Sequence, residues 1–370
     1  MKPETNYSSS GLTIIGGGVS GTALGRLLQL SNVGSLALFE KSRRLGGRAS
    51  LIPLQSSKQS LALGVHQCFI ETKLISEPTV QKMISNEHFI HDLGWRAVTQ
   101  TGIEQENLYE LSSDAWSKLA DKLCSSEPTV SLNLSYHVKS LNYDLNQELW
   151  IIKGDYWYEQ NKQNFEHHTD HLVLSIPPQQ AVNLLENTQK DFDSELAGTG
   201  IIDRQLSNLI RNLSHITSQS QWVTLLRINH YVFSHISQRA LDESKMIKAL
   251  KQLSKDESTS SVIVALHTCP KWSKVNIEAD SNTIGEQCLT ELKKLLTDIQ
   301  GFEDKHIEIL KVHRWRYASV TLNKATDSIY LSSLRLGLCG EALLPGSIEN
   351  GVQRALQSAI NLYSEIDLST

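Results

Sequence analysis

The segment from Leu12 to Arg48 most constrains how this chain can fold. It begins with the apolar run Leu12–Ile15, continues as Gly-Gly-Gly-Val-Ser-Gly, and reaches Glu40 after a helical pattern and a second apolar run. A G-x-G-x-x-G string alone is weak evidence, but this one follows a predicted strand, opens a predicted helix and precedes an acid at the end of the next strand. The segment therefore predicts a dinucleotide-binding strand–turn–helix–strand unit.

Each key residue of this unit has a physical role. Gly16 permits the tight turn, Gly18 lets the backbone approach a pyrophosphate, and Gly21 lets helix and strand pack closely. The N-terminus of the helix directs unpaired N–H groups at the phosphates. Glu40 lies 24 residues after Gly16, where its carboxylate can bind both ribose hydroxyls of an adenosine and disfavours a 2′-phosphate. A glycine-rich turn without a ligand is the alternative.

Length and charge narrow the function classes. At 370 residues the chain can bury a large core and is expected to form two lobes. A net charge of −5 argues against a nucleic-acid surface. No stretch approaches the roughly 20 apolar residues of a membrane span. Met1–Ser10 is polar, so we expect a disordered lead-in to the first strand rather than a signal peptide.

The cysteines and histidines do not suggest a metal site. Five cysteines are scattered without a C-x-x-C pair, which predicts neither a zinc site nor a disulfide framework and favours a reduced, cytoplasmic location. His167, His168 and His171 are expected in a polar loop and at the start of a strand. Metal binding there is an alternative, but a solvated loop is the favoured interpretation.

The rest of the chain alternates strand and helix patterns. Helical patterns cover Ser113–Cys124, Ile201–Leu213, Glu243–Leu253, Ser281–Ile299 and a final segment from about Gly351. Strand patterns cover Val130–Leu141 (a pair with a turn), Asp170–Pro178, Trp222–Ile228, Ser261–His267, Ile307–Trp315, Ile329–Leu331 and Leu336–Cys339. Leu149–Lys153 and Asp155–Tyr158 suggest a hairpin around Gly154.

These patterns resemble the flavin-containing amine oxidase superfamily and, within it, most resemble renalase-type FAD-dependent oxidoreductases. The matching motifs extend from residue 12 to residue 363. They are the first glycine motif with Glu40-Lys41 and Leu45-Gly46-Gly47-Arg48, the loop Leu63-Gly64-Val65-His66, the strand Asp170–Pro178, the segment Trp315-Arg316-Tyr317-Ala318, and Gly337–Glu341 followed by Glu349-Asn350-Gly351-Val352. The second glycine pair and the C-terminal motif favour FAD over free NAD.

The resemblance implies roles for particular residues. Arg48 would meet the pyrophosphate or the flavin edge, Glu341 a ribityl hydroxyl, and the backbone of Val138 the adenine. A surface arginine, a strand-end glutamate and a core valine are the respective alternatives. The full set expected to bind the cofactor is Gly16, Gly18, Val19, Ser20, Gly21, Glu40, Lys41, Gly47, Arg48, Gly64, Val138, Gly340, Glu341, Gly351 and Val352.

The chain also departs from the amine oxidases it resembles. Many of these carry a lysine near flavin N5 in a strand of the second lobe, whereas Trp222–Asn229 contains none. Many also place an aromatic residue just before the C-terminal helix, where this chain has Ser347, Ile348 and Glu349. True amine oxidation is therefore disfavoured, and the renalase-type resemblance implies oxidation of a reduced pyridine nucleotide or an isomer of one. No flavin-linking cysteine motif is recognisable, so FAD is expected to bind noncovalently.

We expect an α/β fold: a Rossmann-like FAD-binding domain of glutathione-reductase type and a smaller, mixed-sheet substrate domain. The FAD lobe would comprise about 1–72, 125–185 and 310–370, and the substrate lobe about 73–124 and 186–309. The expected reaction is hydride transfer from a small organic donor to flavin N5, with reoxidation by O₂ to H₂O₂. His66, Trp315 and Arg316 are candidates for the pocket wall; a hydrogen bond to the flavin loop, a core position and pairing with an acid are their alternatives.

Two other function classes remain open. One is a flavoenzyme acting on an isoprenoid or on a side chain of a partner protein. The other is a non-catalytic FAD- or NAD-binding partner protein. A broad apolar tunnel would favour the first, and slow flavin reduction by every donor would favour the second.

Overall fold

The computed structural model describes residues 6–53, 60–62, 64, 68–71, 74, 78, 96–98, 108–111, 130–159, 161–195, 200–256, 260–297, 302–321, 329–345 and 351–366. The chain divides into two compact units. Unit 1 comprises Met1–Ser50, Gln67–Thr217 and Val320–Thr370, and unit 2 comprises Leu51–His66 and Ser218–Ser319. The fold is thus a mixed α/β fold with a Rossmann-like unit and a second, sheet-containing unit.

The main sheet of unit 1 is parallel at its centre. Its strands run in the order β16 (Ile329–Leu331), β17 (Leu336–Leu338), β11 (Asn161–Leu174), β1 (Asn6–Ile15), β2 (Leu36–Glu40) and β8 (Val130–Leu134). β16 alone of these is antiparallel to its neighbour. Ile15 pairs with Phe39 and Leu174, and Leu174 with Leu338. The residues that follow β1, β2 and β17 therefore emerge together at one edge of the sheet.

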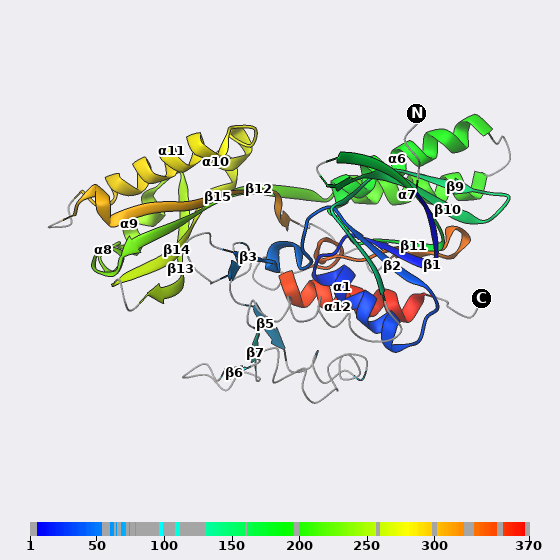
Figure 1. The fold of residues 1–370 in the computed structure, drawn as a ribbon, viewed down its shortest axis with the longest axis horizontal. Coiled ribbons are helices and arrows are strands. Elements are labelled where there is room, and N and C mark those ends of the chain that lie inside the picture. The colour runs from blue at the N-terminus through cyan, green and yellow to red at the C-terminus, as the bar shows by residue number, and fades with distance from the viewer. Residues whose placement is uncertain are drawn as a thin grey trace. The chain divides into compact units, whose positions relative to one another are not determined.

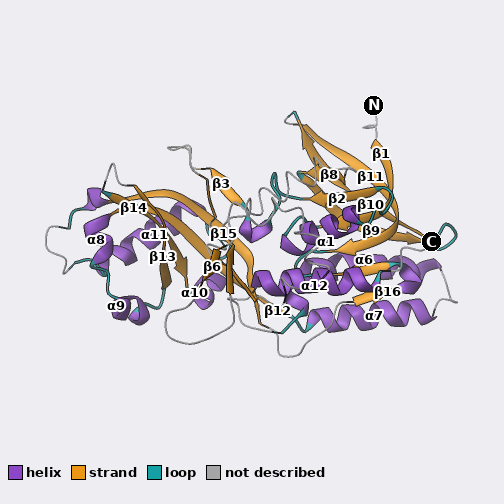
Figure 2. Cartoon of the chain, turned by 90° about the horizontal axis from the view of Figure 1, so that it is seen from below, coloured by secondary structure: helices purple, strands orange, loops and turns teal. Residues whose placement is uncertain are grey.

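Helices cover both faces of this sheet (Figure 1, Figure 2). α1 (Val19–Leu30) and α12 (Gly351–Glu365) lie on one face. The same sheet continues from β11 into β10 (Leu149–Tyr158) and β9 (Tyr136–Asp144) by antiparallel pairing, and these strands pack with α6 (Pro178–Glu195) and α7 (Gly200–Ser214) on the other side. Trp150 anchors this second layer, since its indole is fully buried and donates to the Leu334 carbonyl at 2.7 Å. No described helix is long and apolar enough to cross a bilayer.

Unit 2 is built on a four-stranded sheet. Its order is β13 (Ile247–Asp256), β14 (Ser261–Thr268), β12 (Thr217–Asn229) and β15 (Ile307–Thr321), and β14 is antiparallel to both neighbours. α10 (Pro270–Val275) and α11 (Ser281–Lys294) pack on one face around the buried Trp222. The shorter elements are α8 (His230–Ser234), α9 (Gln238–Glu243), the pair β3 (Leu51–Pro53) and β4 (Ser60–Ala62), and, in unit 1, β5 (Cys68–Glu71), β7 (Leu108–Leu111) and β6 (Arg96–Val98).

Most predicted strands are confirmed, but two expectations near the N-terminal strand are wrong. Asn6–Ser10 is the first half of β1 and pairs with Phe165–Thr169, so this part of the expected lead-in is a strand. The three histidines lie inside β11 rather than in a loop, and His167 is buried. Both segments are rich in polar residues, which are typical of loops. They form strands here because hydroxyl side chains of β1 form hydrogen bonds with the buried imidazole of His167.

The predicted helix at Glu243–Leu253 is also wrong. α9 ends at Glu243, and β13 begins at Ile247. The pairing of β13 with β14 shifts register between Ile247 and Ala249 and again between Gln252 and Ser254. These irregularities break the two-residue alternation of a strand, so the apolar residues recur at a spacing that imitates a helix.

Gly154 does not form the predicted hairpin turn. β10 is continuous through it, and the glycine lies at a register shift opposite β9, where a Cβ would collide with the His137 carbonyl. The glycine thus allows close approach of two strands. α6 follows the predicted stop at Pro177-Pro178 directly, and the helix expected at Ser113–Cys124 lies outside the described residues.

The compact units begin and end at other residues than the expected lobes. α7 was expected in the substrate lobe, whereas its Leu206 and Leu209 are buried in the core of unit 1 with Leu185 of α6. The assignment of one lobe to the cofactor and the other to the substrate stays a prediction.

Candidate functional site

The first glycine motif forms a tight connection between β1 and α1. Gly16 has φ +108°, and a Cβ there would collide with the Ser175 carbonyl. A Cβ at Gly21 would collide with the Gly16 carbonyl. At Gly18, in contrast, a Cβ would meet nothing within 4 Å, and this N-cap residue gives α1 no side-chain cap. The turn therefore presents open space at the uncapped N-terminus of a helix, which is a ready anion site.

Glu40 is fixed against this turn. Its Oε2 accepts from the Gly17 N–H at 2.7 Å, and its Oε1 accepts from the Ser42 N–H at 2.7 Å. These bonds hold the carboxylate beside the turn and leave it lone pairs for a further donor. Lys41, the next residue, is exposed.

The second glycine pair lies directly on the first turn. The Gly46 N–H donates to the Gly17 carbonyl at 2.7 Å, and a Cβ at Gly47 would lie 3.3 Å from Gly18 Cα. Gly46 and Gly47 have φ +99° and +55°, a region that favours glycine. The first glycine turn and Gly46-Gly47 thus form one continuous backbone surface, and Arg48 follows directly after it.

Arg48 meets Glu341 and Gly351, which lie nearly 300 residues later in the sequence. The Arg48 guanidinium forms an ion pair with the Glu341 carboxylate. A Cβ on Gly351 would meet the same carboxylate, so Glu341 can hold this position without moving only because residue 351 is glycine. Gly340, just before Glu341, donates its N–H to Ser358 Oγ at 2.9 Å, and a Cβ on it would meet nothing within 4 Å. We call the set Gly16–Gly21, Glu40, Gly46–Arg48, Gly340-Glu341 and Gly351-Val352 the cradle.

Sequence reasoning missed one charged residue beside the cradle, Arg354. It lies in the first turn of α12, close to the start of α1, since Ser20 Oγ donates to the Ala355 carbonyl at 2.8 Å. Only 6% of Arg354 is exposed, and burial lowers the pKa of its guanidinium. The available signal was that Arg354 is the only charged residue in the sequence from Gly351 to Ser364.

Three other expected residues are not part of the cradle. Val138 is buried in the core of unit 1, and a backbone role toward adenine stays a prediction. Gly64 is half-buried in unit 2. His66 lies outside the described residues, as do Ser347–Glu349.

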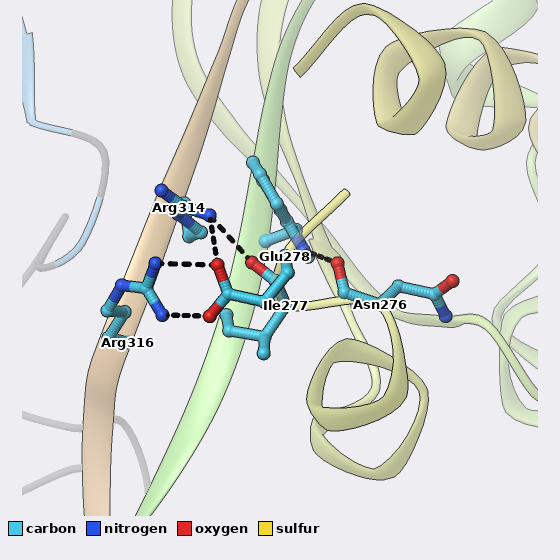
Figure 3. A network of polar contacts seen from close by, with 6 residues as sticks. Asn276, Ile277, Glu278, Arg314 and Arg316 are labelled. Carbon is cyan, nitrogen blue, oxygen red and sulfur yellow. Dashed lines mark hydrogen bonds and ion pairs between the residues drawn. The ribbon is translucent and has the colours of Figure 1, made fainter. Parts of the chain in front are cut away.

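Arg316 is engaged with an acid in unit 2 (Figure 3). Its guanidinium makes a two-pronged ion pair with Glu278, with Nη2 2.9 Å from Oε2, and this hydrogen bonding lowers the pKa of the Glu278 carboxyl. Arg314 donates to the Ile277 carbonyl at 2.8 Å and lies over the Trp222 ring. The structure therefore favours the acid-pairing alternative for Arg316 over a pocket wall.

Trp315 lies on the opposite face of the same sheet. Its ring packs edge-on against His313 at 4.2 Å between centroids, beside the buried Val223, Leu225 and Ile263. Burial lowers the pKa of His313 to about 4, so this imidazole is neutral at pH 7. The Trp315 Nε1 atom is buried and has no hydrogen-bond partner among the residues that the structure describes. A pocket-wall role for Trp315 stays a prediction.

Comparison with known proteins supports the fold. Residues 14–71 match the model of an NAD(P)-binding Rossmann-like domain. No curated protein matches the chain in sequence.

Several solved structures share the architecture over almost the whole chain. One is putrescine oxidase bound to putrescine, at 9% identity and a TM-score of 0.57, covering 98% of this chain and 99% of that one. Cyclohexylamine oxidase from Brevibacterium oxydans, at 10% identity and a TM-score of 0.52, covers 96% and 99%. An oxidoreductase from Methanosarcina mazei, at 10% identity and a TM-score of 0.53, covers 94% and 99%. The chain thus contains an NAD(P)-binding Rossmann-like segment within a fold shared with amine oxidases.

Proposed function

We propose that this protein is an FAD-dependent oxidoreductase of the flavin-containing amine oxidase superfamily, with a cofactor domain of glutathione-reductase type. The convergence of Arg48, Glu341 and Gly351 on the first glycine turn carries this proposal. A glycine turn with Glu40 alone would suit NAD equally well. Glu341 and the start of α12 would extend the site beyond the adenosine diphosphate part of a cofactor, as FAD requires.

The open backbone at Gly18 and Gly340 and the buried charge of Arg354 fit a large anionic cofactor. Glu40 would hold the adenosine ribose, the start of α1 and Arg48 the pyrophosphate, and Glu341 a ribityl hydroxyl. The N–H groups of Gly351 and Val352 would face the flavin N1/O2 edge. Bound noncovalently, FAD would supply a two-electron acceptor that takes hydride at N5 and passes its electrons to O₂, giving H₂O₂.

The proposed donor is a reduced pyridine nucleotide, or an isomer of one, rather than an amine. β12 contains no lysine over its whole length, Thr217–Asn229. A dihydropyridine already carries a transferable hydride, so the protein need only hold its ring over N5 and exclude water. This assignment follows the renalase-type resemblance.

The first test identifies the cofactor. We expect the purified protein to be yellow and to release intact FAD on denaturation, because FAD is proposed to bind noncovalently. The apoprotein should recover the yellow form with FAD and not with NAD. A colourless protein that binds NAD but not FAD would overturn the proposed function.

The second test identifies the donor. Anaerobic stopped-flow mixing with dihydronicotinamides, their isomers, primary amines, amino acids and polyenes should show the fastest flavin bleaching with a dihydropyridine. Fast bleaching by an amine and none by any dihydropyridine would return the protein to the amine oxidases. Bleaching by neither would favour a larger substrate or a protein partner.

A further inference from the structure

Among the described residues, Arg354 is a buried cation without an ion-pair partner. Its Nη1 donates to the Leu344 carbonyl at 3.1 Å, and its Nε is buried without a hydrogen-bond partner in the same part of the chain. No ion pair joins it to any residue in the part of the chain that the structure describes. One neutral hydrogen bond does not compensate for the desolvation of a guanidinium. A bound anion beside Arg354 would stabilise its buried charge.

The nearby charges do not supply that anion. Glu341 raises the pKa of Arg354 and Arg48 lowers it, so both act on it electrostatically. The Glu341 carboxylate, however, is already ion-paired with Arg48. The ion pair with Arg48 therefore leaves Arg354 without a carboxylate of its own among the described residues.

We propose that Arg354 is a cofactor-positioning residue, whose guanidinium pairs with an anionic oxygen of bound FAD. That oxygen belongs to the pyrophosphate or to the N1/O2 edge of the flavin, which becomes anionic on reduction, since the first turn of α12 adjoins both the start of α1 and Glu341. The inference rests on the proposed function and adds a residue that the cofactor motifs do not contain.

The proposal predicts opposite effects on the apoprotein and on cofactor binding. Arg354→Met keeps an unbranched side chain of similar width but removes the charge. We expect the apoprotein variant to melt at the same temperature as the wild type or higher, because an uncompensated buried charge is gone. FAD should bind about 10- to 150-fold more weakly, as for the loss of a charge-assisted hydrogen bond. A merely structural arginine would give lower melting temperatures in both states.

The experiment compares full-length wild type, Arg354→Met, Arg354→Gln and Arg354→Lys, each as apoprotein and with FAD. Arg354→Gln removes the charge but keeps a donor for the Leu344 carbonyl, so it replaces Arg354→Met in the comparison if the methionine variant does not fold. Arg354→Lys restores a positive charge and should recover most of the affinity. Arg211→Met on α7 is the matched control, since Arg211 is exposed and bonds only Asn208 among described residues; it should bind FAD as the wild type does.

Binding of ADP and of riboflavin, together with the midpoint potential of bound flavin, locates the anion. A parallel loss of ADP affinity indicates the pyrophosphate. An unchanged ADP affinity with a lower midpoint potential indicates the flavin edge. Unchanged FAD affinity in the neutral variants, or a lower melting temperature of their apoproteins, would overturn the inference while leaving the proposed function in place. A wild type that binds no FAD would overturn both.

Discussion

His167 shows how a single buried side chain makes the stability of this protein depend on pH. Its Nδ1 lies 2.6 Å from Ser8 Oγ, and its Nε2 lies 2.9 Å from both Ser10 Oγ and Thr13 Oγ1. Burial, with a smaller effect from His168, lowers the pKa of His167 to about 4. The hydroxyls can satisfy a neutral ring but cannot stabilise an extra charge as a carboxylate would.

The folded pKa lies below the ordinary value of 6.5, so the stabilisation is present above pH 6.5 and is lost as the pH falls toward 4. Lowering the pH from 7.5 to 5 should cost unit 1 about 2 kcal/mol through this residue. Urea unfolding at the two pH values measures the effect. His167→Asn should remove it, whereas His215→Asn at an exposed position should not. An equal pH dependence in wild type and His167→Asn would contradict the prediction.

The motif residues of the cradle could be predicted from sequence because their roles depend on spacing along the chain. Glu40 follows Gly16 at a fixed interval, and the structure places its carboxylate on the Gly17 N–H. Arg354 and His167 could not be predicted, because what surrounds them comes from other elements: Leu344 for one, and β1 for the other.

At the scale of elements, the glycines of the turn between β1 and α1 have different roles. Gly16 and Gly21 are needed for folding, whereas Gly18 is proposed to be needed for binding. We expect Gly18→Ala to leave the apoprotein as stable as the wild type, since the added Cβ meets nothing and φ is −72°. The same Cβ occupies the space proposed for the pyrophosphate, so FAD affinity should fall at least tenfold, a loss of about 1.4 kcal/mol.

Gly34→Ala is the matched control, because its Cβ also meets nothing within 4 Å and Gly34 is not part of the cradle. Melting temperatures of the apoproteins and titration with FAD check both variants. Wild-type FAD affinity in Gly18→Ala would show that the phosphates do not cross this turn.

Element types were predictable wherever strands alternate regularly and helices present one apolar face. β13 and Gly154 mark the limit. Each register shift in β13 moves its later side chains to the other face, and the sequence carries no separate mark of that shift. A glycine that admits a neighbouring strand looks the same in sequence as one that turns the chain.

The whole molecule contains separate hydrophobic cores, one centred on Trp150 in unit 1 and one around Trp222 in unit 2. We therefore expect two unfolding transitions in differential scanning calorimetry. All cradle residues belong to unit 1, so FAD at 100 times its Kd should raise one transition by about 5–10 °C, from about 2.7 kcal/mol of added stability. A single transition that shifts as a whole would contradict independent cores.

The order in which the chain is synthesised gives the ion pair between Arg48 and Glu341 a further consequence. Nearly 300 residues separate its two partners, and α12 follows Glu341. During translation the glycine turn leaves the ribosome long before the acid and helix that complete the cradle. The strands of Ser218–Ser319 are contiguous and can pair earlier. If the cradle holds FAD as proposed, the cofactor gains its full set of contacts only after Glu341 and α12 have been synthesised, and a product truncated before Glu341 would lack the carboxylate that pairs with Arg48.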